Sequence, residues 1–269
     1  MEPFEVLAEE PGLPTVELPS TLAEIYGGDL GLEESCVYAN FVATLDGVVA
    51  IPGLPRSNEV IAGGSDADRF LMGLLRAFAD AVLVGAGVLR ASPKGTWRAE
   101  KIHPPSAEAY GELRRRLGLP PAPEIAILTG SGSIDPAHPV LTRRAVVLTS
   151  DAGATRLAGK VPEKSAVVSL GARQRFGGAE IVDALRERGH RRILCEAGPH
   201  TFGTLLAARQ VDQLFLTTSP FLAGDAGAGS RLRLVEAADL VPLVESDLRS
   251  VRRHGDHLFT RHAIASRSA

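Results

Sequence analysis

The 269-residue sequence predicts a single α/β domain with a mostly parallel sheet, helices on both of its faces and a C-terminal antiparallel hairpin. Three observations lead to this fold class. Short apolar segments alternate with helical segments along most of the chain. The segment 80–87 is a continuous apolar run, which is typical of a parallel strand buried on both faces. Near the end, the segments 241–252 and 257–262 flank Gly255 and Asp256, as expected for a hairpin at the sheet edge.

The first 34 residues differ in character from the rest. Residues 1–34 are rich in Pro, Glu and Gly, and long elements are interrupted by three prolines, Pro11, Pro14 and Pro19. We therefore expect an arm laid over the domain, with regular structure beginning at Cys36. The domain itself is predicted to cover 35–269.

The first core strand is predicted over 37–45, because this apolar run ends at Asp46–Gly47, a strong turn signal. Residues 48–64 contain several Gly and Pro and are expected to form a loop. Ser65 or Asp66 then caps a helix. The apolar residues of that helix lie on one face: Phe70, Leu71, Leu74, Leu75 and Phe78. It leads directly into the buried strand 80–87.

The remaining elements continue the same alternation. Strands are predicted over 124–129, 145–149, 166–170, 192–195 and 213–218. Helices are predicted over 106–117, 151–158, 179–188 and 200–208. The sequence contains no internal repeat and no linker between domains, which favours one domain.

The composition favours a soluble protein that binds neither nucleic acid nor membranes. The formal net charge is −3, and the dense basic cluster Arg114–Arg116 is expected to form a solvated helix face. The longest apolar run, around 81–89, is much shorter than the ~20 residues that span a bilayer. Residues 1–10 hold four acidic and no basic side chains, unlike a secretory signal. We therefore expect a cytoplasmic protein.

Cysteine and histidine predict neither a disulfide nor a metal site. Cys36 and Cys195 lie far apart in apolar strand contexts, which favours two buried thiols. No spacing of cysteine and histidine suits a metal ion, since His254 and His257 flank the hairpin turn and the other five histidines are scattered. We expect no bound metal.

The segment 193–206 is the most informative one for function. Its apolar strand runs into Glu196, then into the turn Gly198–Pro199, and a helix follows. The unpaired N–H groups and partial positive charge of a helix start favour phosphate groups. Ligands of open α/β sheets bind at the carboxyl ends of strands. On this segment alone, a dinucleotide site and an ordinary turn with an exposed Glu both remain open.

Three turns are expected to meet at one edge of the sheet: 44–47, 84–88 and 196–199. Gly85 and Gly87 allow the backbone to approach a diphosphate, although the full glycine triplet and the acidic ribose-binding residue of the usual dinucleotide motif are missing. Asp46 and Glu196 would face this crevice and act as acid, base or substrate anchor. For Asp46, a simple turn residue remains the alternative.

Arg76 lies near the end of the first core helix. An arginine there suits phosphate binding through its planar fork. From the sequence pattern alone, an exposed helix arginine is the favoured interpretation. Serine nucleophile motifs, NTPase phosphate loops and cysteine–histidine dyads are absent from the sequence, which disfavours covalent catalysis and phosphoryl transfer.

Several stretches together resemble one family: 39–47, 68–80, 84–87, 192–199 and 211–224. In this order they are similar to the reductase domain of the riboflavin-biosynthesis pyrimidine deaminase/reductase family, the RibD C-terminal domain. They resemble more closely the free-standing pyrimidine reductase-like proteins of actinobacteria. The likeness spans residues 36–262.

The resemblance implies a dihydrofolate-reductase-like fold that binds NADPH and reduces the ribosylamino group of a pyrimidine 5′-phosphate in riboflavin biosynthesis, without flavin or metal. It implies that Asp46 and Glu196 are catalytic and bind the substrate, that Asn40 also contacts the substrate, and that Arg76 holds its phosphate. The implied cofactor-binding residues lie at strand ends and one helix start: Val42, Thr44, Gly85, Ala86, Gly87, Val88, Ser92, Leu170, Gly198, Pro199, His200, Thr201, Phe202, Gly203 and Thr204.

Some residues depart from the family pattern. Val88 replaces the usual Thr of a Gly-x-Gly-Thr turn and so removes a hydroxyl that would bond the cofactor. Ala197 replaces the first Gly of Glu-Gly-Gly, and Ser92 stands near a position where many relatives carry Asp. Asn40 stands where the bifunctional enzymes often have Lys, although the actinobacterial group also has Asn. The sequence lacks the zinc-binding deaminase signature.

Two alternatives to this activity stay open. A dihydrofolate-type or other heteroaromatic substrate fits the same fold, because a fold does not determine the substrate. A nucleotide-binding homologue without turnover is the second, suggested by Val88 and Ala197. The sequence does not decide between NADPH and NADH. We expect a homodimer, since relatives are commonly dimers and the closing hairpin offers an edge that a second copy can cover.

Overall fold

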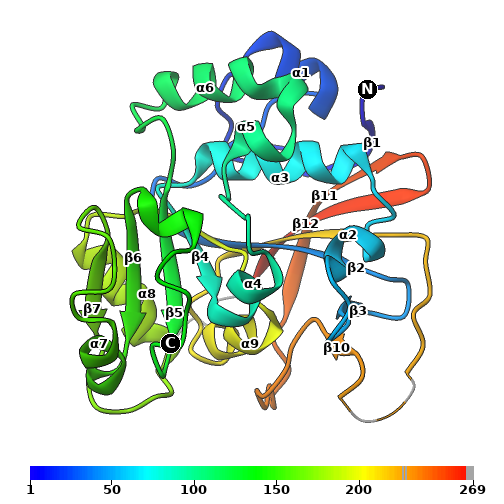
Figure 1. Cartoon of the computed structure of the whole chain (residues 1–269). Helices are drawn as coiled ribbons and strands as arrows, with labels where there is room; N and C mark the ends of the chain where they lie inside the picture. Colours follow the sequence, from blue (N-terminus) through cyan, green and yellow to red (C-terminus); the bar gives the residue numbers. More distant parts are fainter. Residues whose placement is uncertain (226, 228, 265–269) are drawn as a thin grey trace.

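Residues 1–225, 227 and 229–264, which the computed structural model describes, form one ten-stranded sheet covered by helices on both faces (Figure 1). The strand order is β1-β11-β12-β9-β2-β8-β4-β5-β6-β7. The strands from β9 to β7 run parallel to one another, and β12, β11 and β1 extend the sheet in antiparallel fashion. The predicted α/β class with a mostly parallel sheet is confirmed.

The elements have the following bounds. The strands are β1 (Glu5–Glu9), β2 (Cys36–Ala43), β3 (Val48–Ala50), β4 (Ala81–Gly85), β5 (Glu124–Thr129), β6 (Ala145–Thr149), β7 (Ala166–Ser169), β8 (Arg192–Cys195), β9 (Gln213–Thr218), β10 (Leu232–Arg233), β11 (Ser246–His254) and β12 (His257–Ile264). The helices are α1 (Ser20–Tyr26), α2 (Ser57–Ile61), α3 (Asp66–Phe78), α4 (Ala86–Ala91), α5 (Ala99–Ile102), α6 (Ala107–Arg116), α7 (Asp151–Leu157), α8 (Gly178–Glu187) and α9 (Pro199–Ala207).

Two apolar cores lie on opposite faces of the sheet. Tyr38 and Leu194 belong to the core shared with α1, α3 and α6, whereas Ala39 and Cys195 belong to the core shared with α8 and α9. Successive residues of a strand point to opposite faces, so this division follows from the continuous apolar runs of the central strands.

Helix α3 forms as its sequence predicts. The hydroxyl of Ser65 accepts a hydrogen bond from the Asp68 N–H at 3.2 Å, which satisfies one of the free donors of the first turn. The apolar residues of one face are buried against the sheet, among them Phe70, Leu74 and Phe78. This helix delivers Arg76 to the carboxyl end of the central strands.

The N-terminal residues contain regular structure, so the expectation that it begins at Cys36 is wrong. Strand β1 pairs with β11, and helix α1 follows it. Phe4 is buried, and its ring lies 4.7 Å from that of Phe259 in an edge-to-face contact. Arg252 donates from Nε to the Tyr26 carbonyl at 2.9 Å. These tertiary contacts outweigh the local signal of the prolines.

The predicted C-terminal hairpin is confirmed, but its position and start differ from the prediction. Strand β11 begins at Ser246, and the residues before it include Pro242, which has no N–H for a ladder, and the exposed Val241. The hairpin also does not form the sheet edge, because β1 pairs along the outer side of β11.

The predicted loop over 48–64 contains two short elements. Strand β3 pairs with β10 in a small second sheet, and helix α2 precedes α3. The Gly and Pro residues of this segment lie outside these two elements. The loop prediction is therefore correct at those residues and wrong for β3 and α2.

Both cysteines are free and buried, as predicted. Burial raises the pKa of the Cys36 and Cys195 thiols to about 12. In the part of the chain that the structure describes, the helices are too short or too polar to cross a membrane.

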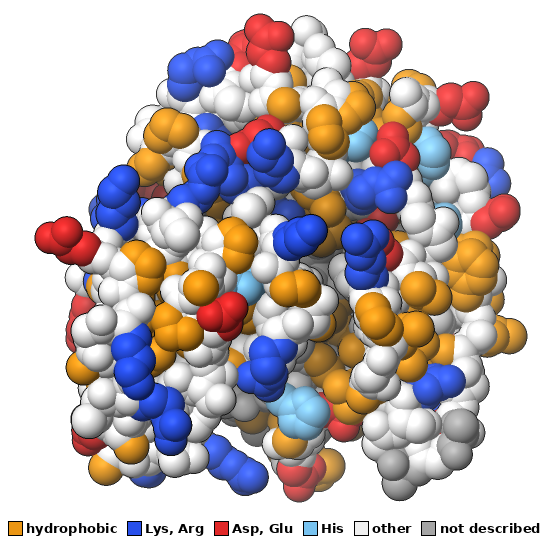
Figure 2. Space-filling model, in the orientation of Figure 1, with side chains coloured by type: hydrophobic (Ala, Val, Ile, Leu, Met, Phe, Trp, Pro, Cys, Tyr) orange, Lys and Arg blue, Asp and Glu red, His pale blue; other side chains and the backbone are white. Residues whose placement is uncertain are grey.

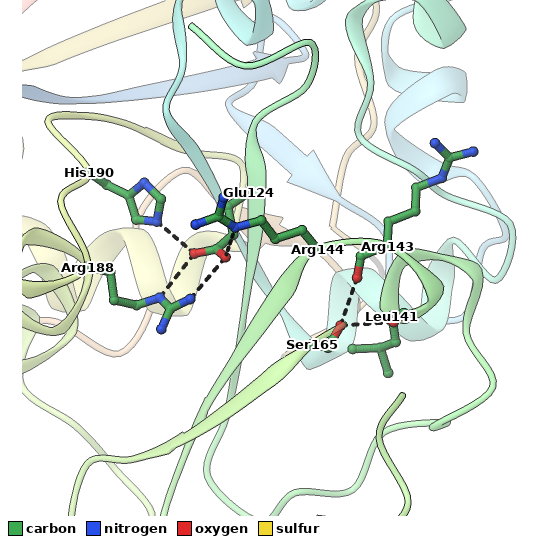
Figure 3. A network of polar contacts seen from close by, with 7 residues as sticks. All are labelled: Glu124, Leu141, Arg143, Arg144, Ser165, Arg188 and His190. Atoms are coloured by element: carbon green, nitrogen blue, oxygen red, sulfur yellow. Dashed lines mark hydrogen bonds and ion pairs between the residues drawn. The ribbon is translucent and has the colours of Figure 1, made fainter. Parts of the chain in front are cut away.

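A polar network at the amino end of the sheet joins three segments (Figure 3). The Glu124 carboxylate, at the start of β5, accepts hydrogen bonds from Nε and Nη2 of Arg188, each at 3.0 Å. Nε2 of His190 lies 2.7 Å from the same carboxylate, and Arg144 donates to it at 3.2 Å. Glu124 therefore ties β5 to the residues that lead into β8 and β6.

Candidate active site

Two predicted site residues lie side by side where β8 ends against β2. Ala39 pairs with Cys195 in the parallel ladder, so Asn40, which is still within β2, and Glu196, which follows the end of β8, are neighbours and point to the α3 face. Asn40 is 8% exposed, and its Oδ1 has no hydrogen-bond partner among the described residues. A buried amide oxygen without a partner is costly, which marks this position for a ligand donor.

Arg76 reaches this point from α3 and forms an ion pair with Glu196. Its Nε donates to Oε1 at 2.9 Å and its Nη2 donates to Oε2 at 2.6 Å. Both side chains are only 7% exposed, so the interpretation of Arg76 as an exposed helix arginine is wrong. The alternative of an ordinary exposed Glu196 is wrong for the same reason. Two parallel charge-assisted bonds hold the carboxylate in one orientation.

Two nitrogen atoms of the Arg76 guanidinium already bond Glu196, which limits how Arg76 can bind a phosphate. Nε and Nη2 face Glu196, and within the described residues Nη1 has no protein partner. A phosphate held by Arg76 would therefore be met by Nη1 or would compete with Glu196.

A second arginine fixes the end of α3 and was misread from the sequence. Arg114, expected on a solvated face, is 2% exposed. Its Nη1 donates to the carbonyl oxygens of Arg76 and Ala79 at 3.1 and 2.9 Å, and its Nε donates to that of Pro120 at 2.6 Å. Burial lowers the pKa of Arg114 to about 10. A cation on the last carbonyls of a helix is favourable, because those groups carry the negative end of the helix dipole.

The two glycine turns lie against each other. A Cβ atom on Gly85 would lie 3.8 Å from Oγ1 of Thr201, and one on Gly198 would lie 3.9 Å from Cγ2 of Val88. Gly198 is the N-cap of α9, and no side chain caps that helix start. In the first turn, Pro199 has no N–H and the Thr201 N–H donates to the Gly198 carbonyl at 3.0 Å, so the His200 N–H is left to meet an oxygen atom of a ligand such as a diphosphate.

The expected cofactor residues divide into two groups. Those around the facing turns lie together: Gly85, Ala86, Gly87, Val88, Gly198, Pro199, His200, Thr201 and Thr204. Phe202 instead points into the core, where its ring lies 4.8 Å from Phe41, and Gly203 packs against the backbone of Glu236. These two can offer only backbone to a ligand.

Other expected cofactor residues lie farther apart. Leu170 follows β7, which is three strands from β4, or about 14 Å at the usual strand spacing. Ser92 ends α4, and its carbonyl lies 3.0 Å from Nε2 of His138. Val42 and Thr44 lie at the end of β2, which is next to β8 and two strands from β4, the strand that leads into the Gly85 turn.

Asp46 lies beyond the end of β2, in the turn to β3. Its carboxylate accepts hydrogen bonds from the Thr44 hydroxyl and from the N–H groups of Ala223 and Gly224. These bonds lower its pKa to about 2. Asp46 is therefore a fully ionised, well-anchored group at neutral pH.

One buried carboxyl near this site escaped the sequence reasoning. Asp68, in the first turn of α3, is 5% exposed. Burial raises its pKa, although nearby Thr217 and His257 lower it. The sequence showed Asp68 only as part of the helix start, because an acidic residue there is also expected as a capping partner.

The surface is hollowed between the part built by α4 and α9 and the part built by α2 and β3, and basic side chains border the hollow (Figure 2). Among the described residues, no group of three or more His, Cys, Asp or Glu side chains has the arrangement of a metal site. The site thus combines a buried ion pair, an amide oxygen that meets no donor in the described part of the chain, and a helix start without a side-chain cap.

Residues 35–256 match the model of the RibD C-terminal domain. The chain belongs to the RibD C-terminal domain family. A curated relative, the 2,5-diamino-6-ribosylamino-4(3H)-pyrimidinone 5′-phosphate reductase of Archaeoglobus fulgidus, is 25% identical over 193 residues, which cover 70% of this chain and 81% of the relative.

Solved structures share the RibD C-terminal domain fold. A pyrimidine reductase-like protein from Corynebacterium diphtheriae superimposes with a TM-score of 0.68 at 22% identity, covering 92% of this chain and all of that one. A diaminohydroxyphosphoribosylaminopyrimidine deaminase/5-amino-6-(5-phosphoribosylamino)uracil reductase from Thermotoga maritima gives 0.60 at 21% identity. That match covers 87% of this chain and 57% of the bifunctional protein.

Proposed function

We propose that the protein reduces the ribosylamino group of a pyrimidine 5′-phosphate to a ribitylamino group, with NADPH as hydride donor, as a step of riboflavin biosynthesis. The observation that carries the proposal is the buried Arg76–Glu196 pair beside the Asn40 amide oxygen, which meets no donor in the described part of the chain, next to a helix start without a side-chain cap. Family membership and the activity named for the archaeal relative support it.

The residues present fit a nicotinamide dinucleotide. The start of α9 offers the His200 N–H, and Gly85 and Gly198 leave room for close approach of a diphosphate. When bound, NADPH supplies the hydride. The protein then has to hold the sugar C1 within about 3.5 Å of the donor carbon and exclude competing water, a positioning effect that is a large part of catalysis.

Different side chains bind different parts of the substrate in this proposal. Glu196, oriented by Arg76, accepts hydrogen bonds from N–H groups of the pyrimidine, while Oδ1 of Asn40 accepts another. In this proposal, Nη1 of Arg76 binds the phosphate. Asp46 lies at the far end of β2 and contributes to the wall of the site.

The test is NADPH oxidation by the purified protein, followed by nicotinamide absorbance, with the ribosylaminopyrimidine phosphate and dihydrofolate supplied in parallel. We expect oxidation with the pyrimidine alone. Oxidation with dihydrofolate alone would assign a folate-type activity. NADPH binding with no oxidation of either would assign a homologue without turnover. The same assay with NADH tests the cofactor preference.

We also propose that the protein is a homodimer in the cytoplasm. The outermost strand, β1, is exposed along its whole length and offers the sheet edge that a second copy can cover. Light scattering of the purified protein tests the dimer, and a monomer at micromolar concentration would contradict it. Cell fractionation tests the location.

A further inference from the structure

Two segments far apart in the sequence are joined beyond the end of β2. The β2–β9 ladder ends at the pair Ala43 and Thr218. The contact continues past it, because Ser219 N–H donates to the Ala43 carbonyl and Leu45 N–H donates to the Phe221 carbonyl, each at 2.8 Å. The turn from β2 to β3 and the loop that follows β9 therefore form one surface.

Asp46 makes the side-chain contacts that hold this surface together. Its Oδ1 accepts from the Thr44 hydroxyl at 2.5 Å and from the Ala223 N–H at 3.1 Å, while its Oδ2 accepts from the Gly224 N–H at 2.7 Å. Its own carbonyl accepts from Arg233 at 2.5 Å. Both carboxylate oxygens are thus engaged by donors of the protein.

A carboxylate in this setting is poorly suited to give a proton. Its three donors all favour the ionised form and lower its pKa to about 2, so the carboxylate is ionised at neutral pH. A general acid works best with a pKa near the working pH. Asp46 instead accepts hydrogen bonds from the Thr44 hydroxyl and from two backbone N–H groups of the loop.

The loop 219–224 exposes apolar side chains and contacts the residues just before α3. The ring of Phe221 lies against Gly63, close enough to exclude a side chain there. Leu222 is 74% exposed, and Leu45 in the facing turn is 62% exposed. Since Gly63 lies just before α3, the loop lies between the β2–β3 turn and the start of this helix.

We propose that Asp46 is a positioning residue: its carboxylate clasps residues 219–224 onto the β2–β3 turn and thereby holds an apolar wall, formed by Leu45, Phe221 and Leu222, beside the substrate. This inference rests on the proposed function for its effect on turnover. It replaces the catalytic role that the family resemblance implied for Asp46.

The test compares Asp46→Asn and Asp46→Glu with the unmodified protein. Asn keeps one oxygen acceptor but offers an NH2 group where Gly224 N–H needs an acceptor. Glu keeps the charge and the proton chemistry but displaces the carboxylate by one methylene. We expect hydrogen exchange of the Ala223 and Gly224 amides to be at least tenfold faster in both variants. We expect KM for the pyrimidine to rise about tenfold in both, with the pH dependence of kcat unchanged.

Asp225→Asn is the matched control. Its carboxylate also accepts from loop groups, the Gly227 N–H at 3.0 Å and the Ser230 hydroxyl at 2.8 Å, but it does not reach the β2–β3 turn. We expect amide exchange at Ala223 and Gly224 and KM to stay within twofold of the unmodified protein.

Two results would overturn the proposal. One is unchanged amide exchange at Ala223 and Gly224 in Asp46→Asn. The other is the loss of an ionisation from the kcat profile of Asp46→Asn together with full activity of Asp46→Glu, which would make Asp46 an acid or base. If the unmodified protein turns over no pyrimidine, the proposed function fails, while amide exchange still decides whether the clasp exists.

Discussion

Arg76 and Glu196 lie 120 residues apart in the chain, yet two hydrogen bonds of 2.9 and 2.6 Å join them beneath the surface of the candidate site. A buried ion pair is costly to break, because the remaining charge is left without a partner in a medium of low polarity. The pair therefore links the orientation of the carboxylate to the position of α3.

Glu196→Gln tests the carboxylate. Gln cannot form the ion pair, so we expect turnover of the pyrimidine to fall about 100-fold or more, as when an oriented charged group is lost from an active site. NADPH affinity, measured by fluorescence titration, should change less than threefold. Glu112→Gln, which alters an exposed pair with Arg116, serves as the control. Unchanged turnover in Glu196→Gln would remove this residue from the mechanism.

Arg114→Met tests the anchoring of α3. It removes the donors that hold the carbonyls of Arg76 and Ala79, and we expect the free energy of unfolding to fall by about 3 kcal/mol. Urea unfolding measures this. The neighbouring exposed Arg115→Met should change it by less than about 0.5 kcal/mol. Similar values for the two variants would show that Arg114 does not hold the helix.

Val88→Thr tests the cofactor cradle. Val88 lies against the start of α9, and Thr restores the hydroxyl that the family pattern places there. One additional hydrogen bond is worth about 0.5–1.5 kcal/mol, so we expect NADPH to bind roughly 2–10-fold more tightly. Val140→Thr, at a buried position away from the turns, should give no such gain. Weaker binding by Val88→Thr would argue against a cofactor at these turns.

Glu124→Gln tests the network of Figure 3. Burial raises the pKa of Glu124, but the bonds from His190 and Arg188 outweigh it and lower the pKa to about 2. Because the folded pKa lies below the unfolded one, the network stabilises the fold above about pH 5, and this contribution is lost as the pH falls towards 2. We expect on the order of 2 kcal/mol.

Chemical unfolding at pH 7 and pH 3 measures that contribution. The unmodified protein should lose more stability between these pH values than Glu124→Gln does. Glu59→Gln, in an exposed pair with Arg56, should behave like the unmodified protein. An equal loss in Glu124→Gln and the unmodified protein would contradict the role of the network.

Deletion of residues 1–10 tests the N-terminal strand. It removes β1 and the buried Phe4 ring, and it leaves Arg252 without its partner Glu9, which it meets at 2.6 Å. We expect a loss of at least about 3 kcal/mol in the free energy of unfolding. Deletion of residues 1–3 is the control. If both deletions leave the unfolding midpoint unchanged, the strand is dispensable.

The sequence predicted elements that local signals determine. Ser65 caps α3, the apolar runs became the parallel strands, and the turn at Gly255 closes the hairpin. It could not predict that β1 pairs with β11, since that pairing depends on contacts between residues more than 240 positions apart, such as Arg252 with Glu9. No local pattern reports such contacts.

In the candidate site, too, local sequence signals predicted some residues correctly, while others depend on tertiary packing. Glu196 and the glycine turns were visible, because strand ends and helix starts carry local signals. Arg76 and Arg114 were both misread as exposed, because a helical arginine has the same pattern whether it faces water or caps a neighbouring segment. Only the packing of α3 and α6 distinguishes the two.

The place of β2 in the middle of the sheet has a consequence for biosynthesis. Its neighbours β8 and β9 begin about 150 and 170 residues after it ends, which a ribosome takes on the order of 10–30 s to add. Until then the apolar strand Cys36–Ala43 has no sheet to join. We therefore expect the apolar strand to stay unpaired for this time during synthesis and the protein to refold slowly from denaturant.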